Sequence, residues 1–89
     1  MRTLKKHYLL EELRLEDGCA LHLVDKVKEN YGVTLVVHGV YPLLRSMERE
    51  GVLQSYESDD PEREGRPRRM YRLTDRGRAT LDRWTKAVE

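Results

Sequence analysis

The chain has 89 residues, 38% hydrophobic and 37% charged, with a formal net charge of +1 at neutral pH. This describes one small, heavily charged domain and excludes the compositional extremes of disordered chains. With no apolar run near the roughly 20 residues of a membrane-spanning helix and no signal peptide, we expect a cytoplasmic protein that does not contact a membrane.

The residues that usually carry chemistry are sparse and scattered. Cys19 is the single cysteine, which excludes an internal disulfide and favours a small buried side chain. The histidines at positions 7, 22 and 38 lie in three separate segments, so no metal site is expected. No phosphate loop or nucleophile motif is present. We therefore expect neither an enzyme nor a cofactor.

Two amphipathic helices are predicted, over residues 4–15 and 20–31. The first carries Leu9 and Leu13 on one apolar side, and a glycine, Gly32, ends the second. A β-branched stretch over residues 33–37 is then either a short extended link or the lead into a third helix. The second helix has the most regular apolar stripe in the chain, formed by Ala20, Leu23, Val24, Val27 and Tyr31.

A third helix is predicted from Val40 to Glu50. Because proline is tolerated only near a helix start, Pro42 places that start around Val40 to Tyr41, with Tyr41 at the helix N-terminus. The apolar stripe of this helix is Val40, Leu43, Leu44 and Met47, and the opposite side carries Tyr41, Arg45, Glu48 and Arg49.

An arginine-rich hairpin follows, with strands predicted over residues 52–58 and 68–73 and a protruding turn between them. Three helices and this hairpin make a winged helix-turn-helix, a mainly α fold with a small β-hairpin. Arginines suit phosphate and guanine edges, although a solvated hairpin paired with nearby acidic residues would have the same composition. Seven arginines lie between residues 63 and 78, in the hairpin and just after it: Arg63, Arg66, Arg68, Arg69, Arg72, Arg76 and Arg78.

A last helix starts at Thr74-Asp75, which divides the chain into a DNA-binding domain at 1–73 and a C-terminal dimerisation helix at 74–89 packed on it. A domain this small gains from association, so a homodimer is favoured. The alternative is that Trp84 covers the first helix within one subunit. The predicted dimer interface comprises Leu9, Leu13, Leu81, Trp84 and Val88.

Three ordered motifs carry a family resemblance: Tyr41-Pro42-Leu43-Leu44-Arg45, Gly65-Arg66-Pro67 and Tyr71-Arg72-Leu73-Thr74. Together they resemble the signature of PadR-type transcriptional regulators over residues 39–78. The resemblance implies a dimeric winged-helix repressor with Tyr41, Pro42 and Arg45 near DNA and Arg66, Arg68 and Arg69 on the wing. Some regulators of this type bind flat aromatic compounds between the C-terminal helices of the dimer, which would allow such an inducer to stack on Trp84; the favoured role of Trp84 is a plain dimer contact. Unlike the family's usual helix start, residues 36–39 offer no capping hydroxyl.

The sequence therefore predicts a sequence-specific regulator that binds double-stranded DNA as a homodimer on an inverted repeat, with half-sites about one helical turn apart. We expect Arg45 and Arg49 in the major groove, His38 near a phosphate, and the wing arginines on the backbone. The alternative function is a winged-helix module for protein–protein contact that does not bind DNA. A partner protein would then cover Tyr41 and Arg45.

Overall fold

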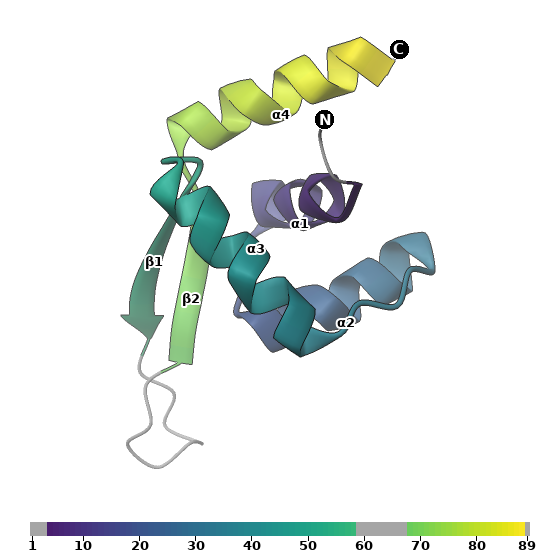
Figure 1. The fold of residues 1–89 in the computed structure, drawn as a ribbon, viewed down its shortest axis with the longest axis vertical. Coiled ribbons are helices and arrows are strands. Elements are labelled where there is room, and N and C mark those ends of the chain that lie inside the picture. Colours follow the sequence, from purple (N-terminus) through teal and green to yellow (C-terminus); the bar gives the residue numbers. More distant parts are fainter. Residues whose placement is uncertain (1–3, 59–67, 89) are drawn as a thin grey trace.

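The computed structural model describes residues 4–58 and 68–88 and has the predicted mainly α fold with one hairpin (Figure 1). The hairpin points away from the helix that ends the chain. The predicted helix over residues 4–15 is confirmed, as is the one over 20–31. The elements in chain order are α1 (Leu4–Leu15), α2 (Ala20–Tyr31), α3 (Val37–Arg49), β1 (Leu53–Ser58), β2 (Arg68–Leu73) and α4 (Asp75–Val88).

Helix α2 ends at the predicted glycine. Gly32 has a left-handed backbone, with φ of 67°, and its N–H donates to the carbonyl of Lys28 at 3.0 Å. A side chain with a Cβ rarely adopts this conformation, so glycine ends the helix at little cost. The connection to α3 is short, and Leu35 within it is buried in the core. Helices α2 and α3 therefore form the predicted helix-turn-helix.

Helix α3 begins at Val37, three residues before the predicted start, so Tyr41 lies in its second turn and not at its N-terminus. Val36 is the N-cap residue and makes no side-chain hydrogen bond; its carbonyl instead accepts from the N–H groups of Gly39 at 2.9 Å and Val40 at 3.2 Å. Pro42 lies inside the helix and cannot donate to the carbonyl of residue 38. His38 and Pro42 are both on the exposed side, where water can satisfy that carbonyl.

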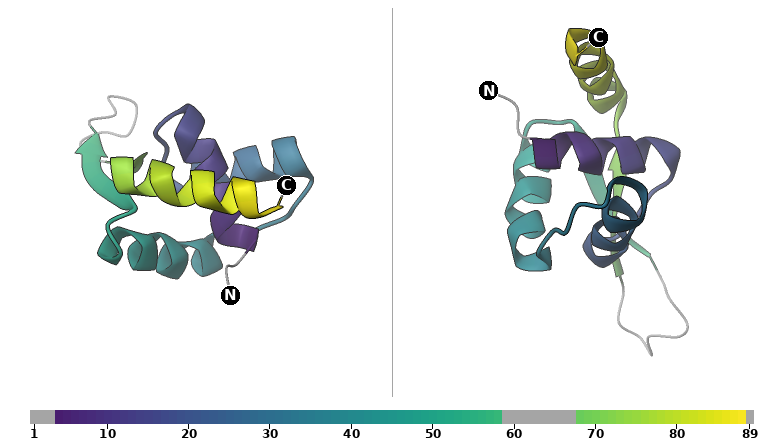
Figure 2. Two further views of the ribbon diagram at one scale, coloured as in Figure 1. Left: turned by 90° about the horizontal axis from the view of Figure 1, so that it is seen from above. Right: turned by 90° about the vertical axis from the view of Figure 1, so that its right-hand side faces the viewer.

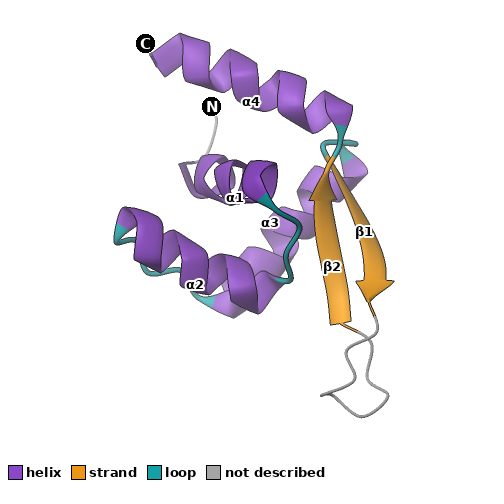
Figure 3. Cartoon of the chain, turned by 180° about the vertical axis from the view of Figure 1, so that it is seen from behind, coloured by secondary structure: helices purple, strands orange, loops and turns teal. Residues whose placement is uncertain are grey.

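The hairpin is antiparallel, with a register that runs from Leu53 opposite Leu73 to Ser58 opposite Arg68. The first strand starts one residue later than predicted, and the second has its predicted bounds. The predicted turn lies outside the described residues, apart from Ser58 at its start. A single β-bridge joins Gly18 to Tyr71, so the linker between α1 and α2 pairs with the outer edge of β2 (Figure 3).

Helix α4 crosses over α1 at the end of the molecule opposite the hairpin (Figure 2). The hydroxyl of Thr74 accepts from the N–H of Gly77 at 3.0 Å and donates to the carbonyl of Gly51 at 2.6 Å, which confirms the predicted helix start. Leu81 is 1% exposed and belongs to the same core as the other helices. The packing of α4 is therefore continuous with that of the winged helix.

Candidate nucleic-acid interface

The outward face of α3 collects polar and aromatic side chains in one row. Tyr41 is 45% exposed, and Arg45 and Arg49 are also exposed. On the opposite side Val40, Leu44 and Met47 are at most 1% exposed, as the predicted stripe requires. One side of α3 is thus packed against the core, and the other side is exposed to solvent. The residues predicted to contact DNA from α3 are all exposed: His38, Tyr41, Pro42, Arg45 and Arg49.

The wing arginines predicted to contact DNA differ in their surroundings. Arg69 is exposed, and its Nη1 donates to the Ser55 hydroxyl at 3.3 Å. Arg68 is partly buried, and its Nη1 lies 3.9 Å from the Cys19 sulfur. Arg66 lies outside the described residues. The structure therefore presents Arg69 to solvent more fully than Arg68.

Helix α3 and the wing are joined by a carboxylate. Glu48 Oε2 accepts the backbone N–H of Ser55 at 3.1 Å and also the hydroxyl of Ser55. Glu48 was predicted to lie on the outward side of α3, but it is partly buried because it turns toward β1. This contact fixes the hairpin against the helix that carries Arg45 and Arg49.

A second carboxylate, Asp17 in the linker between α1 and α2, contacts the other face of the hairpin. Its Oδ2 accepts the hydroxyl of Tyr56 at 2.6 Å and lies 3.5 Å from Nε of Arg72. The Arg72 guanidinium also stacks over the Tyr56 ring, 4.9 Å from its centroid. The hydrogen bond to Asp17 is the main cause that raises the pKa of Tyr56 above its ordinary value of 10.0.

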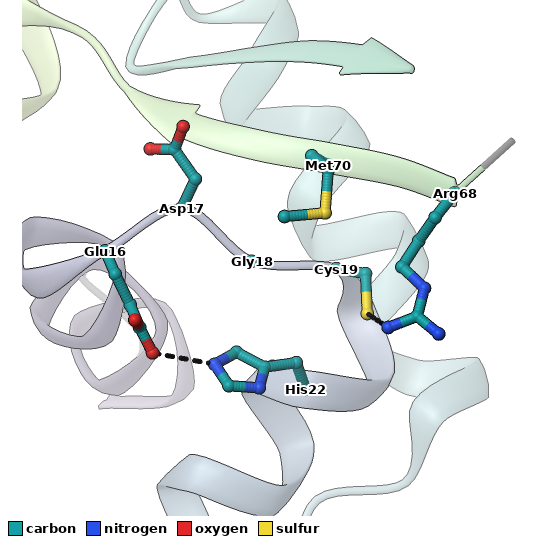
Figure 4. A pocket seen from close by; sticks show the side chains of 7 residues that line it. All are labelled: Glu16, Asp17, Gly18, Cys19, His22, Arg68 and Met70. Carbon is teal, nitrogen blue, oxygen red and sulfur yellow. Dashed lines mark hydrogen bonds and ion pairs between the residues drawn. The ribbon is translucent and has the colours of Figure 1, made fainter. Parts of the chain in front are cut away.

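A pocket of about 180 Å³ opens between this linker and the start of β2 (Figure 4). Cys19, predicted as a buried side chain, is only partly buried and faces this pocket. Across it, Glu16 and His22 form a contact of 3.0 Å. Within the described residues, no group of three or more His, Cys, Asp or Glu side chains is placed to hold a metal ion. The lining residues are Glu16, Asp17, Gly18, Cys19, His22, Arg68 and Met70.

The residues predicted for a dimer interface fall into two groups. Leu9, Leu13 and Leu81 are at most 2% exposed within the single chain, so they form the core between α1 and α4 and offer no surface to a second copy. Trp84 is partly buried, with its ring 6.0 Å from the His7 ring. The alternative prediction, in which Trp84 covers α1 within one subunit, agrees with this contact. The side chain of Val88 is outside the described part of the chain.

The sequence profile of the transcriptional regulator PadR-like family matches residues 9–83. The chain belongs to the PadR-like family. This match extends the similarity beyond the segment 39–78, where the motifs lie, into α1, α2 and α4. No curated protein is similar enough to match the chain.

Solved structures have a similar fold, and they include a PadR family protein. A transcriptional regulator from Thermoplasma acidophilum is 27% identical, with a TM-score of 0.81 over 96% of this chain and 78% of that one. A PadR family regulator from Eggerthella lenta is 30% identical, with a TM-score of 0.78 over 92% and 68%. Bacillus subtilis PadR, solved in complex with operator DNA, is 24% identical, with a TM-score of 0.84 over 93% and 47%. The last of these likenesses shows the fold alone.

Within this PadR-like fold, sequence patterns did not reveal the contacts that Asp17 and Glu48 make with the hairpin. The sequence patterns assign no contact to Asp17, and they place Glu48 on the outward side of α3. Hydrophobic periodicity does not report either contact, because the Ser55 partner of Glu48 lies 7 residues away and the Tyr56 partner of Asp17 lies 39 residues away in sequence. Among the described residues, no helix is both long enough and apolar enough to cross a membrane.

Proposed function

We propose that this protein is a sequence-specific DNA-binding transcriptional repressor. The observation that carries the proposal is the two-sided character of α3. The side chains of Val40, Leu44 and Met47 on one side are buried, while those of Tyr41 and Arg45 on the other side are exposed to solvent. The major groove, about 12 Å wide, accepts one helix with such an outward face.

In this proposal the two arginines of α3 have different tasks from those of the wing. Arg45 and Arg49 enter the major groove, where a guanidinium pairs with the two acceptors of guanine. Arg69 and the rest of the wing lie along the phosphate backbone, which orients the protein without reading sequence. The operator complex formed by Bacillus subtilis PadR supports DNA as the ligand.

The proposal includes a homodimer on an inverted repeat. A closed dimer with twofold symmetry places two copies of α3 on successive major grooves, about one helical turn apart. Leu9, Leu13 and Leu81 are buried within the single chain. The dimer contact is therefore made by the exposed surface of α4 and the partly buried Trp84. A flat aromatic inducer at Trp84 remains part of this proposal. Sedimentation equilibrium tests the dimer: Trp84→Ala should move the protein toward the monomer, whereas an unchanged mass would remove Trp84 from the interface.

The test of DNA binding begins with selection of genomic fragments bound by the purified protein, followed by mobility shifts with wild-type and variant protein. Arg45→Ala should bind the selected fragment more weakly and discriminate less against random duplex. A double variant, Arg68→Ala with Arg69→Ala, should weaken binding to both DNAs and flatten the salt dependence. If the wild type shifts no fragment at low salt, the protein–protein module would replace this proposal.

A further inference from the structure

The linker between α1 and α2 touches the hairpin with three consecutive residues, 17, 18 and 19. Its glycine forms two backbone hydrogen bonds with Tyr71, N–H to carbonyl at 3.2 Å and carbonyl to N–H at 2.9 Å. The carboxylate of Asp17 reaches Tyr56 and Arg72. Figure 4 shows the linker running below β2.

The hairpin is held on both faces. Side chains alternate between the faces of a strand, so Ser55 and Tyr56 point to opposite sides. Glu48 of α3 holds the Ser55 side, and Asp17 holds the Tyr56 side. Each face thus has one carboxylate, provided by a different element, that accepts hydrogen bonds from the base half of the wing. With both contacts present the wing cannot tilt toward or away from α3 without breaking one of them.

We propose that Asp17 is a positioning residue for DNA binding, which sets the direction of the wing without touching DNA. This inference rests on the function proposed above. The Asp17–Arg72 ion pair itself contributes little, because the Arg72 side chain is 54% exposed. The hydroxyl of Tyr56 and the β-bridge at Gly18 define one position for the strand pair.

Charge and position predict opposite effects when Asp17 is changed. Removing a carboxylate from a surface that approaches phosphates should, by charge alone, strengthen DNA binding. Loss of a positioning contact should weaken it, because Arg69 no longer meets the backbone in register with α3. The sign of the change in affinity therefore separates the two effects.

The experiment measures fluorescence anisotropy with a labelled duplex of about 30 base pairs taken from the selected genomic fragment, long enough for two half-sites. Asp17→Ala should weaken binding by about fivefold, the equivalent of one lost hydrogen bond of about 1 kcal/mol. Asp17→Asn keeps an acceptor for Tyr56 and should restore most of the affinity. Glu16→Gln is the matched control, since the Glu16 side chain is 62% exposed and contacts His22; it should bind equally or more tightly.

A double-mutant cycle identifies the wing as the element that moves. Arg69→Ala should cost less affinity in the Asp17→Ala background than in the wild type, while Arg45→Ala should cost the same in both. A general loss of folding would reduce both effects equally. Thermal unfolding followed by circular dichroism confirms that each variant is folded. If Asp17→Ala is unfolded, Tyr56→Phe, which removes one hydroxyl, carries the same test and should show the same selective loss at Arg69.

Two results would overturn the inference: tighter or unchanged binding by folded Asp17→Ala, or full additivity of Asp17→Ala with Arg69→Ala. In the Tyr56→Phe arm, unchanged affinity together with an unchanged effect of Arg69→Ala would do the same. These results leave the proposed function intact as long as wild-type protein binds the duplex and Arg45→Ala weakens it. Absence of wild-type binding overturns the proposed function and this inference together.

Discussion

The carboxylate of Glu48, on α3, accepts the backbone N–H of Ser55, on β1, at 3.1 Å. The helix proposed to contact bases and the wing proposed to contact phosphates are therefore joined directly. The same oxygen accepts the Ser55 hydroxyl, which in turn accepts from Arg69 at 3.3 Å. One chain of hydrogen bonds thus runs from α3 to a wing arginine.

Glu48→Ala should lower the free energy of unfolding by about 1–2 kcal/mol, because the Ser55 N–H loses a charged acceptor in a partly buried setting. Urea unfolding measures this. Glu50→Ala, at the exposed end of the same helix, is the control and should stay within about 0.5 kcal/mol of wild type. Equal effects of the two substitutions would show that the Glu48–Ser55 contact contributes nothing to stability.

Gly77→Ala should destabilise the protein although alanine is the better helix former. A Cβ at Gly77 would lie 2.2 Å from the Val52 carbonyl oxygen and 2.6 Å from Leu73, so backbone must move, at a cost of about 1–3 kcal/mol. Gly39→Ala is the matched control, since a Cβ there meets nothing within 4 Å. That change should stabilise the protein by about 0.5–1 kcal/mol. Stabilisation by both substitutions, measured by thermal unfolding, would contradict the close approach of α4 to the wing.

Asn30→Ala should be costly because it leaves the carboxylate of Glu12 without its partner. Glu12 is 5% exposed, and the amide of Asn30 donates to its two oxygens at 2.9 and 3.0 Å. We expect a loss of about 1–3 kcal/mol in the free energy of unfolding. Glu29→Ala, one residue away and exposed, should have little effect. If Asn30→Ala unfolds at the same urea concentration as Glu29→Ala, the partly buried hydrogen bond between Asn30 and Glu12 does not tie α1 to α2.

The Tyr56 phenol gives the Asp17 contact a spectroscopic signature. Its pKa lies above 10.0 mainly because its hydroxyl donates to Asp17, so Asp17→Ala should lower that pKa toward 10.0 in an NMR titration of labelled tyrosine. The pKa of Tyr71 is raised mainly by burial and should not follow. Movement of both tyrosines, or of neither, would contradict a local hydrogen bond.

The same shift makes stability depend on alkaline pH. Because the folded pKa of Tyr56 is raised, its contribution to stability is full below pH 10.0, the ordinary value, and is lost as the pH rises through the folded value. The free energy of unfolding should therefore decline more steeply above pH 10.0 in the wild type than in Tyr56→Phe. Parallel curves would rule out this contribution.

Periodicity alone predicted most of the fold. The bounds of α1, α2 and β2 match the pattern, since each has an apolar stripe or alternation and a clear stop. The predicted start of α3 was wrong, because Pro42 was assumed to lie near the helix start, whereas the helix begins at Val37. One missing hydrogen bond on an exposed side is cheaper than giving up the first turn, which Val36 closes with its carbonyl.

The periodic pattern also predicted which face of α3 is exposed, but it did not predict the contacts that hold the hairpin in place. The buried leucines of α1 and α4 were assigned to a dimer because a stripe does not say whether its cover comes from the same chain. Asp17 and Glu48 act through distant partners on the hairpin, and a single charged residue leaves no periodic signal. Contacts of this kind require the tertiary structure.

The measurement that tests the central proposal most directly compares the affinity of wild-type protein for a fragment selected from genomic DNA and for a random duplex at about 150 mM salt. A sequence-specific regulator should prefer the selected fragment by about a thousandfold or more. Arg45→Ala should reduce that preference by about 5- to 150-fold, the discrimination expected of one bidentate guanine contact of about 1–3 kcal/mol. Equal affinity of the wild type for both DNAs would contradict base readout by α3.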